Sequence, residues 1–193
     1  MLADRGIARA RELAKAGVTR TQIRRLLEQG VVERVGRGLY RDSEGPVTEH
    51  ADLMQAAARV SEGVVCLLSA LRFHGLTTVN PFEVWLALPH KAWRPVQAHP
   101  PMRFVYLSGR ALEAGLERHN LEGAAVRVFS PAKTVADCFK FRSKLGTEVA
   151  VEALKAFRQA HPKELEELWR CAEIDRVGRV LRPYLEALGL VRW

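Results

Sequence analysis

The sequence has few cysteines and no long apolar run, and each absence excludes a class of protein. Its 193 residues contain only three cysteines, Cys66, Cys138 and Cys171, which are far apart and form no Cys-x-x-Cys pair. An odd number of widely spaced cysteines predicts neither a disulfide framework nor a zinc site. No apolar run approaches the roughly 18 residues that a membrane-spanning helix needs, so we expect no membrane association.

Signals for secretion and for catalysis are absent as well. The first residues, MLADRG, include two charged side chains, so they do not resemble a secretory signal, and we expect a cytoplasmic protein. The six histidines are scattered, which predicts no metal site. Asp137, Lys140 and Glu83 suggest a nuclease-like group, but no Asp-then-Glu-x-Lys arrangement lies on consecutive strands. With no phosphate-binding glycine-rich loop either, we predict no enzyme activity and no cofactor.

The sequence does have an excess of positive charge, concentrated near its start. The formal net charge is +8 and the isoelectric point is near 9.9. Residues 1–45 contribute ten Lys and Arg against six Asp and Glu, which leaves the other 148 residues with the same net charge of +4. A dense basic segment favours an anionic partner, most often a nucleic acid.

The stretch GVTRTQIRRLLEQG (17–30) predicts a short helix with a well-defined start. Thr19 is a suitable N-cap, and Gln22 stands at the third helical position, which completes a capping box. Val18 and Ile23 have the spacing of a hydrophobic staple, and Gly30 predicts the end of the helix. Ile23 begins an apolar stripe, so the basic and polar side chains are expected on the opposite, solvent-facing side.

The flanking segments complete a pattern typical of a winged helix-turn-helix. IARARELAKAG (7–17) predicts a preceding helix that ends in a turn at Gly17. VVERV (31–35), the turn Gly36-Arg37-Gly38 and LYR (39–41) predict a β-hairpin with a cation at its tip. Such a hairpin beside a basic helix suits contacts with DNA phosphates. The alternative is a solvated basic helix followed by an unrelated hairpin.

A winged helix normally has one more helix ahead of these two, and only MLADRG precedes Ile7. Either the chain starts late, or the second part of the protein covers the apolar edge that this helix would cover. We place the boundary in the turn-rich stretch RDSEGPVTEH (41–50), which predicts a DNA-binding domain of residues 1–45 and a second domain of residues 46–193.

The second domain is predicted to be mixed α+β with a helical C-terminal half. FEVWLAL (82–88), RFVYL (103–107) and AVRVF (125–129) have the composition of strands. Ser130-Pro131 predicts the start of a helix, because serine caps it and proline suits its first position. Further helices are expected from a cap at Thr147, from Pro162, and from about Ile174 to Leu188. The fold class expected for the whole chain is therefore α+β.

Particular runs of residues resemble the AbiEi family of antitoxins from type IV toxin–antitoxin and phage-defence systems. AGVTRTQIRRLLEQGVVERVGRGLYR is similar to the N-terminal winged helix of that family. LLSALRFHGLTTVNPFEVWLAL and VRVFSPAKTVADCFKFRSKLGTEVAVEALKA are similar to its C-terminal domain, and the run SPAKTVADC is the most particular of these. The resemblance covers nearly the whole chain.

The resemblance implies a transcriptional autorepressor that binds repeats in its own promoter as double-stranded DNA. It also implies that the second domain counters a nucleotidyltransferase toxin encoded alongside, without a stable complex. Two alternatives are a regulator without a toxin partner and an interaction protein that neutralises a toxin by contact. The side chains expected to contact bases and phosphates are Thr19, Arg20, Thr21, Gln22, Arg24 and Arg25 on the helix, and Arg34, Arg37 and Arg41 on the hairpin.

Overall fold

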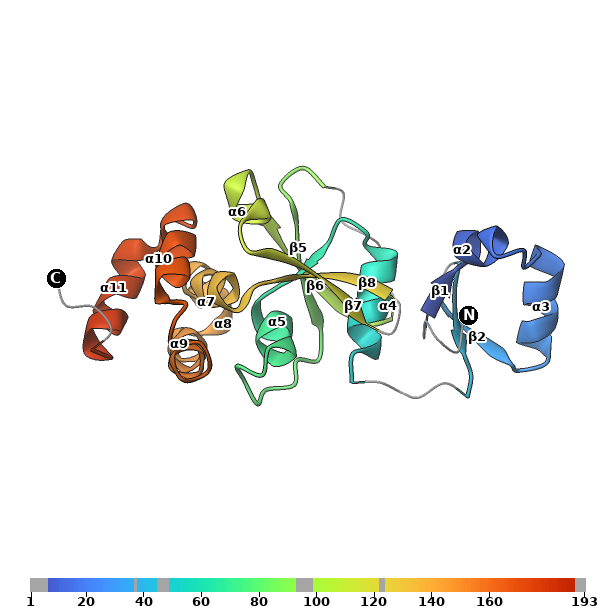
Figure 1. Cartoon of the computed structure of the whole chain (residues 1–193), viewed down its shortest axis with the longest axis horizontal. Helices are drawn as coiled ribbons and strands as arrows, with labels where there is room; N and C mark the ends of the chain where they lie inside the picture. Colours follow the sequence, from blue (N-terminus) through green and yellow to red (C-terminus); the bar gives the residue numbers. More distant parts are fainter. Residues whose placement is uncertain (1–6, 37, 45–48, 93–98, 122–123, 190–193) are drawn as a thin grey trace.

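A computed structural model of the chain describes residues 7–36, 38–44, 49–92, 99–121 and 124–189. The elements follow one another along the long axis of the molecule, as Figure 1 shows. The N-terminal elements lie at one end, a five-stranded sheet lies in the middle, and the C-terminal helices form the other end. The expected α+β class is confirmed. None of the described helices has the length and apolar character needed to cross a membrane.

The N-terminal unit contains two short helices and a three-stranded antiparallel sheet. The strands are in the order β1-β3-β2. Ala8, Leu13 and Ile23 form its small core, with Val18, Leu27 and Tyr40 packed against them. The bounds of its elements are β1 (Ile7–Arg9), α2 (Ala10–Lys15), α3 (Arg20–Glu28), β2 (Val32–Gly36) and β3 (Leu39–Asp42).

The expected helix over residues 7–17 is wrong at its start, because Ile7–Arg9 is a strand. Its backbone pairs with β3, with Ala8 opposite Tyr40, and the side chain of Ala8 is buried in the small core. The helix begins only at Ala10, where Glu12 accepts a hydrogen bond from the backbone N–H of Arg9 at 2.8 Å. Pairing with a strand more than 30 residues away outweighs the near-helical spacing of the apolar residues.

The second unit is built on a mixed sheet in the order β6-β5-β4-β8-β7. Strands β4 and β8 run parallel, as do β5 and β6, whereas the β4–β5 and β7–β8 pairs are antiparallel. The strands are β4 (Val64–Val65), β5 (Val84–Pro89), β6 (Met102–Leu107), β7 (Leu116–Leu121) and β8 (Ala124–Phe129).

Helices cover both faces of this sheet, so nearly all of β5 is buried. Trp85 and Ala87 face the core formed with α5 and the C-terminal helices, whereas Leu86 and Leu88 face the core formed with α4. The helices are α4 (Ala51–Arg59), α5 (Leu67–Phe73), α6 (Arg110–Glu113), α7 (Pro131–Lys140), α8 (Arg142–Leu145), α9 (Thr147–Ala160), α10 (Leu165–Ile174) and α11 (Gly178–Ala187).

The predicted helix starts in this unit are right at one place and wrong at three. Ser130 caps α7, since its side chain accepts a hydrogen bond from Lys133 N, and Pro131 occupies the first turn. At α9 the cap is Gly146, whose φ of +96° suits glycine, and Thr147 is already helical. Helix α10 begins at Leu165 rather than at Pro162, and α11 begins at Gly178 because the chain turns at Arg176, whose φ is +59°.

Helix α4 packs against both sheets and joins the two units (Figure 1). The Nη2 group of Arg9 donates a hydrogen bond to the carbonyl oxygen of Ala58 at 2.6 Å. In the reverse direction, Arg59 Nη2 donates to the carbonyl oxygen of Val35 at 2.8 Å. The side chain of Val35 packs against the α4 core. Helix α4 of the second unit therefore packs on the face of the small sheet opposite α2 and α3.

Candidate nucleic-acid interface

Helix α3 begins with the predicted capping box. Gln22 N donates to Thr19 Oγ1 at 3.2 Å, and Thr19 N donates to Gln22 Oε1 at 2.8 Å. Val18 packs on the core that contains Ile23, as the predicted staple requires. Gly30, with a φ of +69°, follows the C-cap Gln29. Local hydrogen bonds therefore set both ends of this nine-residue helix.

The two faces of α3 differ in burial, as the stripe of apolar residues in the sequence predicts. Ile23 is buried and Leu27 packs beside it, so this face holds the helix against the small core. Thr21 and Arg25 lie on the other side of the helix and are exposed, and Arg20, in the first turn beside the apolar face, is exposed as well. Arg20 and Arg25 form no ion pair with another described residue, so their guanidinium groups can bind an external acceptor.

Two of the predicted contact residues on α3 already have partners inside the helix. Arg24 Nε lies 2.9 Å from Glu28 Oε1, but the side chains are 82% and 62% exposed, so exchanging this ion pair for DNA costs little. Gln22 is exposed, yet its Oε1 accepts hydrogen bonds from the backbone and the hydroxyl of Thr19. A glutamine that reads adenine needs both its oxygen and its nitrogen, so the capping role competes with base contact at Gln22.

The hairpin presents its predicted arginines on opposite faces. Arg34 is exposed and stands opposite Tyr40 in the β2–β3 register, on the face that packs against α2 and α3. Arg41 stands opposite Glu33 on the other face and forms an ion pair with it. Only 21% of the Arg41 side chain is exposed. Arg34 therefore shares a side of the sheet with α3, and Arg41 does not. Arg37 lies outside the described residues.

The sequence interpretation did not single out two further cations of this unit. Arg11 and Lys15 are exposed on α2, close along the chain to the turn that leads into α3. The sequence could have indicated them, because residues four positions apart lie on the same face of a helix, and the buried residue of α2 is Leu13. Arg9, by contrast, faces α4 and bonds to its carbonyl groups, so it belongs to the junction between the units.

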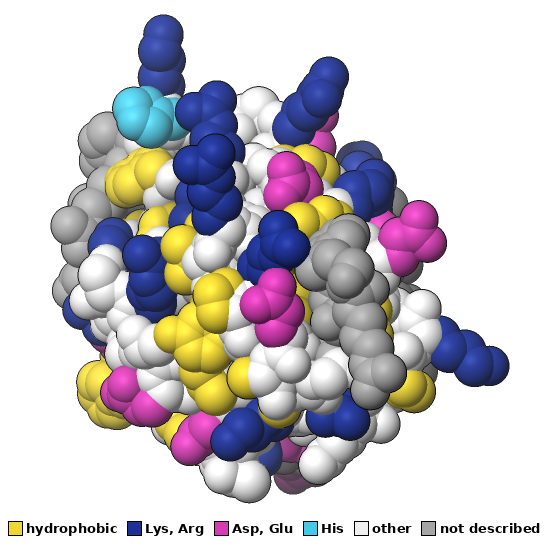
Figure 2. Space-filling view, turned by 90° about the vertical axis from the view of Figure 1, so that its left-hand side faces the viewer, with side chains coloured by type: hydrophobic (Ala, Val, Ile, Leu, Met, Phe, Trp, Pro, Cys, Tyr) yellow, Lys and Arg dark blue, Asp and Glu magenta, His cyan; other side chains and the backbone are white. Residues whose placement is uncertain are grey.

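Other surfaces of the molecule are less suited to a polyanion. Figure 2 shows the opposite end, where Lys and Arg are scattered among acidic and apolar side chains. On the C-terminal helices α10 and α11, Arg170 and Arg182 form ion pairs with Glu167 and Glu186. Part of the positive charge at this end is therefore neutralised by acidic neighbours.

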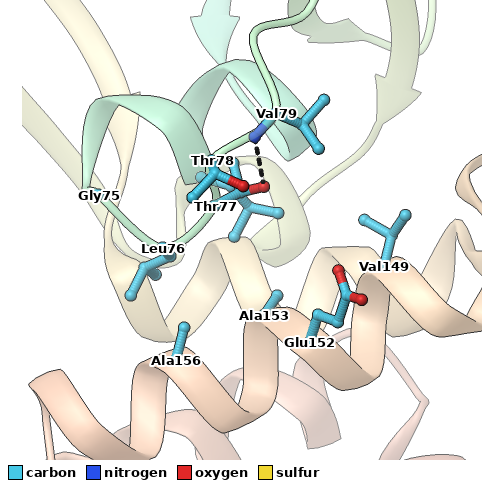
Figure 3. Close-up of a pocket in the computed structure, with 10 residues that line it drawn as sticks. Gly75, Leu76, Thr77, Thr78, Val79, Val149, Glu152, Ala153 and Ala156 are labelled. Carbon is cyan, nitrogen blue, oxygen red and sulfur yellow. Dashed lines mark hydrogen bonds between the residues drawn. The ribbon is translucent and has the colours of Figure 1, made fainter.

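A hollow beside α9 also lacks positive charge among its described lining residues (Figure 3). It lies between the loop after α5 and helix α9, and Val79 N donates to Thr77 Oγ1 at 3.1 Å within that loop. Thr77, Thr78 and Glu152 supply its polar side chains, and the rest of the lining is apolar or glycine. A carboxylate without a cation beside it repels phosphate, so this hollow is not part of a nucleic-acid surface.

The acid and lysine residues weighed for catalysis separate into two groups. Glu83 lies 3.8 Å from Arg103, at one side of the sheet. Asp137 is fully buried and pairs with Lys133 at 2.5 Å, while Lys140 pairs with Asp175 at 3.1 Å. The structure therefore does not gather Glu83 with Asp137 and Lys140.

Asp137 belongs to a buried network of charges between α7 and the end of α10. Lys133 Nζ lies 2.5 Å from Asp137 Oδ1 and 3.0 Å from Asp175 Oδ2. Burial lowers the pKa of Lys133, but the two carboxylates outweigh it and raise that pKa above its ordinary value. Burial raises the pKa of Asp137 to about 7. With Lys133 and both carboxylates almost completely inaccessible, this network links α7 to the turn after α10.

The comparison with protein families finds that residues 1–41 match the model of the AbiEi antitoxin, described as a transcriptional regulator. No curated protein matches the chain. The matched segment contains α2, α3 and β2 and ends within β3, so it covers most of the N-terminal unit and none of the five-stranded sheet. The resemblance inferred from the sequence is thus confirmed for the N-terminal unit.

Proposed function

We propose that this chain is an AbiEi-type DNA-binding antitoxin and autorepressor, whose N-terminal unit acts as a winged helix-turn-helix on repeats in its own promoter. Helix α3 is the recognition helix, and the β2–β3 hairpin is the wing. The family match over residues 1–41 supports the regulatory role. Such a protein acts in the cytoplasm, where the operon is transcribed.

The observation that carries this proposal is a firmly capped helix with exposed polar and basic side chains, of which Arg20 and Arg25 form no ion pair with another described residue. The capping box at Thr19 and the burial of Ile23 orient the helix, and Arg20, Thr21 and Arg25 extend from it. Donors of this kind at the N-terminal end of a helix read base edges in the major groove. Arg34 lies on the same side of the sheet and is placed to bind the flanking phosphates.

We propose that the buried polar groups of the second unit have a structural role rather than a catalytic one. The buried carboxylates Asp137 and Asp175 pair with Lys133 and Lys140, and this network links the helices of the C-terminal half of the unit. We propose that this unit counters a nucleotidyltransferase toxin encoded alongside, without forming a stable complex with it.

The test of DNA binding uses the full chain and a duplex with the promoter sequence of its own gene, compared with a shuffled duplex of equal length. Affinity for the promoter is expected to be about a thousandfold higher or more, and to fall steeply with salt. Arg20→Ala should weaken binding, whereas Arg158→Ala, at an exposed position of α9, should not. Equal affinity for both duplexes, or binding insensitive to salt, contradicts the proposal.

The antitoxin part is tested by co-expression with the neighbouring nucleotidyltransferase. Growth should be restored by the full chain, and the two proteins should not purify together. Co-purification would instead favour neutralisation by direct contact. Promoter binding without an adjacent toxin gene would favour a regulator that acts alone.

A further inference from the structure

A basic groove lies between the N-terminal unit, helix α4 and the paired strands β7 and β8. Its volume is about 360 Å³, which falls in the range of small-molecule sites. The floor consists mainly of alanines and Met54. The polar side chains around it are Arg9, Arg11, Glu12, Ser61, Arg118 and Arg127.

Arg118 and Arg127 stand directly opposite each other in the β7–β8 register. Two like charges at such a position destabilise a sheet, since their Cβ atoms are only about 5 Å apart. Burial, and then the neighbouring charge of Arg118, lower the pKa of Arg127. The charge of Glu62 opposes this shift, but the pKa of Arg127 is still lowered. The facing arginines are therefore a cost to the unliganded fold that an anion would reduce.

Neither arginine of this pair forms an ion pair with another described residue, although the charge of Glu62 acts on Arg127. Arg127 Nη2 donates to the carbonyl oxygen of Ser61 at 3.1 Å, while its buried Nε has no hydrogen-bond partner among the described residues. Arg118 is exposed and forms no hydrogen bond or ion pair with another described residue. The same holds for Arg11, which approaches the groove from α2.

The remaining charged groups of the groove are already engaged. Arg9 donates to the carbonyl oxygens of Ala57 and Ala58, in the last turn of α4, where helical carbonyls lack partners. Glu12 accepts from the backbone N–H of Arg9. Arg11 from the N-terminal unit and Arg118 and Arg127 from the second unit are the three cations left to receive a ligand.

We propose that this groove binds a small phosphate-bearing molecule that bridges the two units. Its phosphate lies between the Arg118–Arg127 pair and Arg11, because the planar guanidinium group matches phosphate oxygens with paired hydrogen bonds. The alanine floor beneath leaves room for the organic part of the ligand. The site is separate from the outer face of α3 and does not depend on the proposed recognition of DNA.

The test measures binding of inorganic phosphate and of adenosine monophosphate to the full chain by calorimetry, with chloride at matched ionic strength as the reference. Saturable binding and a higher unfolding temperature are expected for at least one of the two probes. Arg118→Gln should weaken binding about tenfold or more, as expected for the loss of a charge-assisted hydrogen bond. Arg158→Gln, an exposed arginine of α9, should leave binding unchanged.

The unfolding temperature of the variants without ligand shows whether Arg118 has a binding role or a structural role. Because Arg118 faces Arg127 and forms no ion pair with another described residue, Arg118→Gln should unfold at a temperature equal to or above that of the wild type. If neither probe binds saturably, or if Arg158→Gln lowers affinity equally, the proposal is wrong. If neither probe binds and Arg118→Gln weakens binding of a DNA duplex, the groove is part of the DNA surface and the small-ligand site is overturned.

Discussion

Thr19 and Gln22 exchange two hydrogen bonds across the first turn of α3, one from each backbone N–H to the side chain of the other residue. This reciprocal arrangement means that Gln22, although exposed, contributes first to the stability of the helix. Side chains that cap a helix and side chains that read DNA therefore have to be distinguished by experiment.

Removing the cap should destabilise the protein. Thr19→Ala is expected to lower the free energy of unfolding by about 1 kcal/mol, because the backbone N–H of Gln22 loses its acceptor. Thr21→Ala, on the exposed face of the same helix, is the matched control and should change stability little. Urea denaturation measures the free energy of unfolding of both variants. If Gln22→Ala leaves stability unchanged and relaxes the preference for one base pair, the residue reads DNA instead.

Arg25 is expected to contribute to sequence recognition. Arg25→Ala should weaken binding to the promoter by about 1–3 kcal/mol and relax discrimination at one base position. The measurement is a set of competition assays with duplexes that carry single base-pair changes. A uniform loss across all duplexes would mean that Arg25 contacts phosphate only.

The arginines of the hairpin should differ from one another. Arg34→Ala should weaken binding to all sequences alike and reduce the salt slope by about one unit, and the same is expected for Arg37→Ala. Arg41→Ala should leave the slope nearly unchanged, because Arg41 pairs with Glu33 on the opposite face of the sheet. Affinities measured over a series of salt concentrations distinguish these outcomes. Equal slopes for Arg34→Ala and Arg41→Ala would contradict this division.

Asp137 should make stability depend on pH in an unusual direction. Burial raises the pKa of Asp137 to about 7, whereas an aspartate in the unfolded chain titrates near pH 4. Between about pH 4 and pH 7 the folded protein therefore retains a proton that the unfolded chain releases. The contribution of Asp137 to the free energy of unfolding falls as pH rises, by about 1 kcal/mol per pH unit.

The variant Asp137→Asn cannot titrate and should lack this decline. Denaturation at several pH values compares the variant with the wild type, so that the contributions of groups far from Asp137 are common to both. Parallel profiles for the two proteins would show that Asp137 titrates in its ordinary range.

Features that depend on hydrogen bonds between neighbouring residues were predictable. The cap at Thr19, the end of α3 near Gly30 and the start of α7 at Ser130 were each predicted from residues close together in the chain, and the structure confirms them. The start of α9 was misplaced by one residue, because glycine and threonine are both acceptable caps and the chain direction at Gly146 decides between them.

Other features depended on segments that meet only in the folded molecule. Ile7–Arg9 is a strand because it pairs with β3. Arg41 is half-buried where it forms an ion pair with Glu33 on the neighbouring strand. The sequence by itself determined a basic, capped helix followed by a hairpin, since those signals are local. Only the tertiary structure decided which arginines remain available to a partner, because strand pairing and the packing of α4 determine which guanidinium groups the protein itself engages.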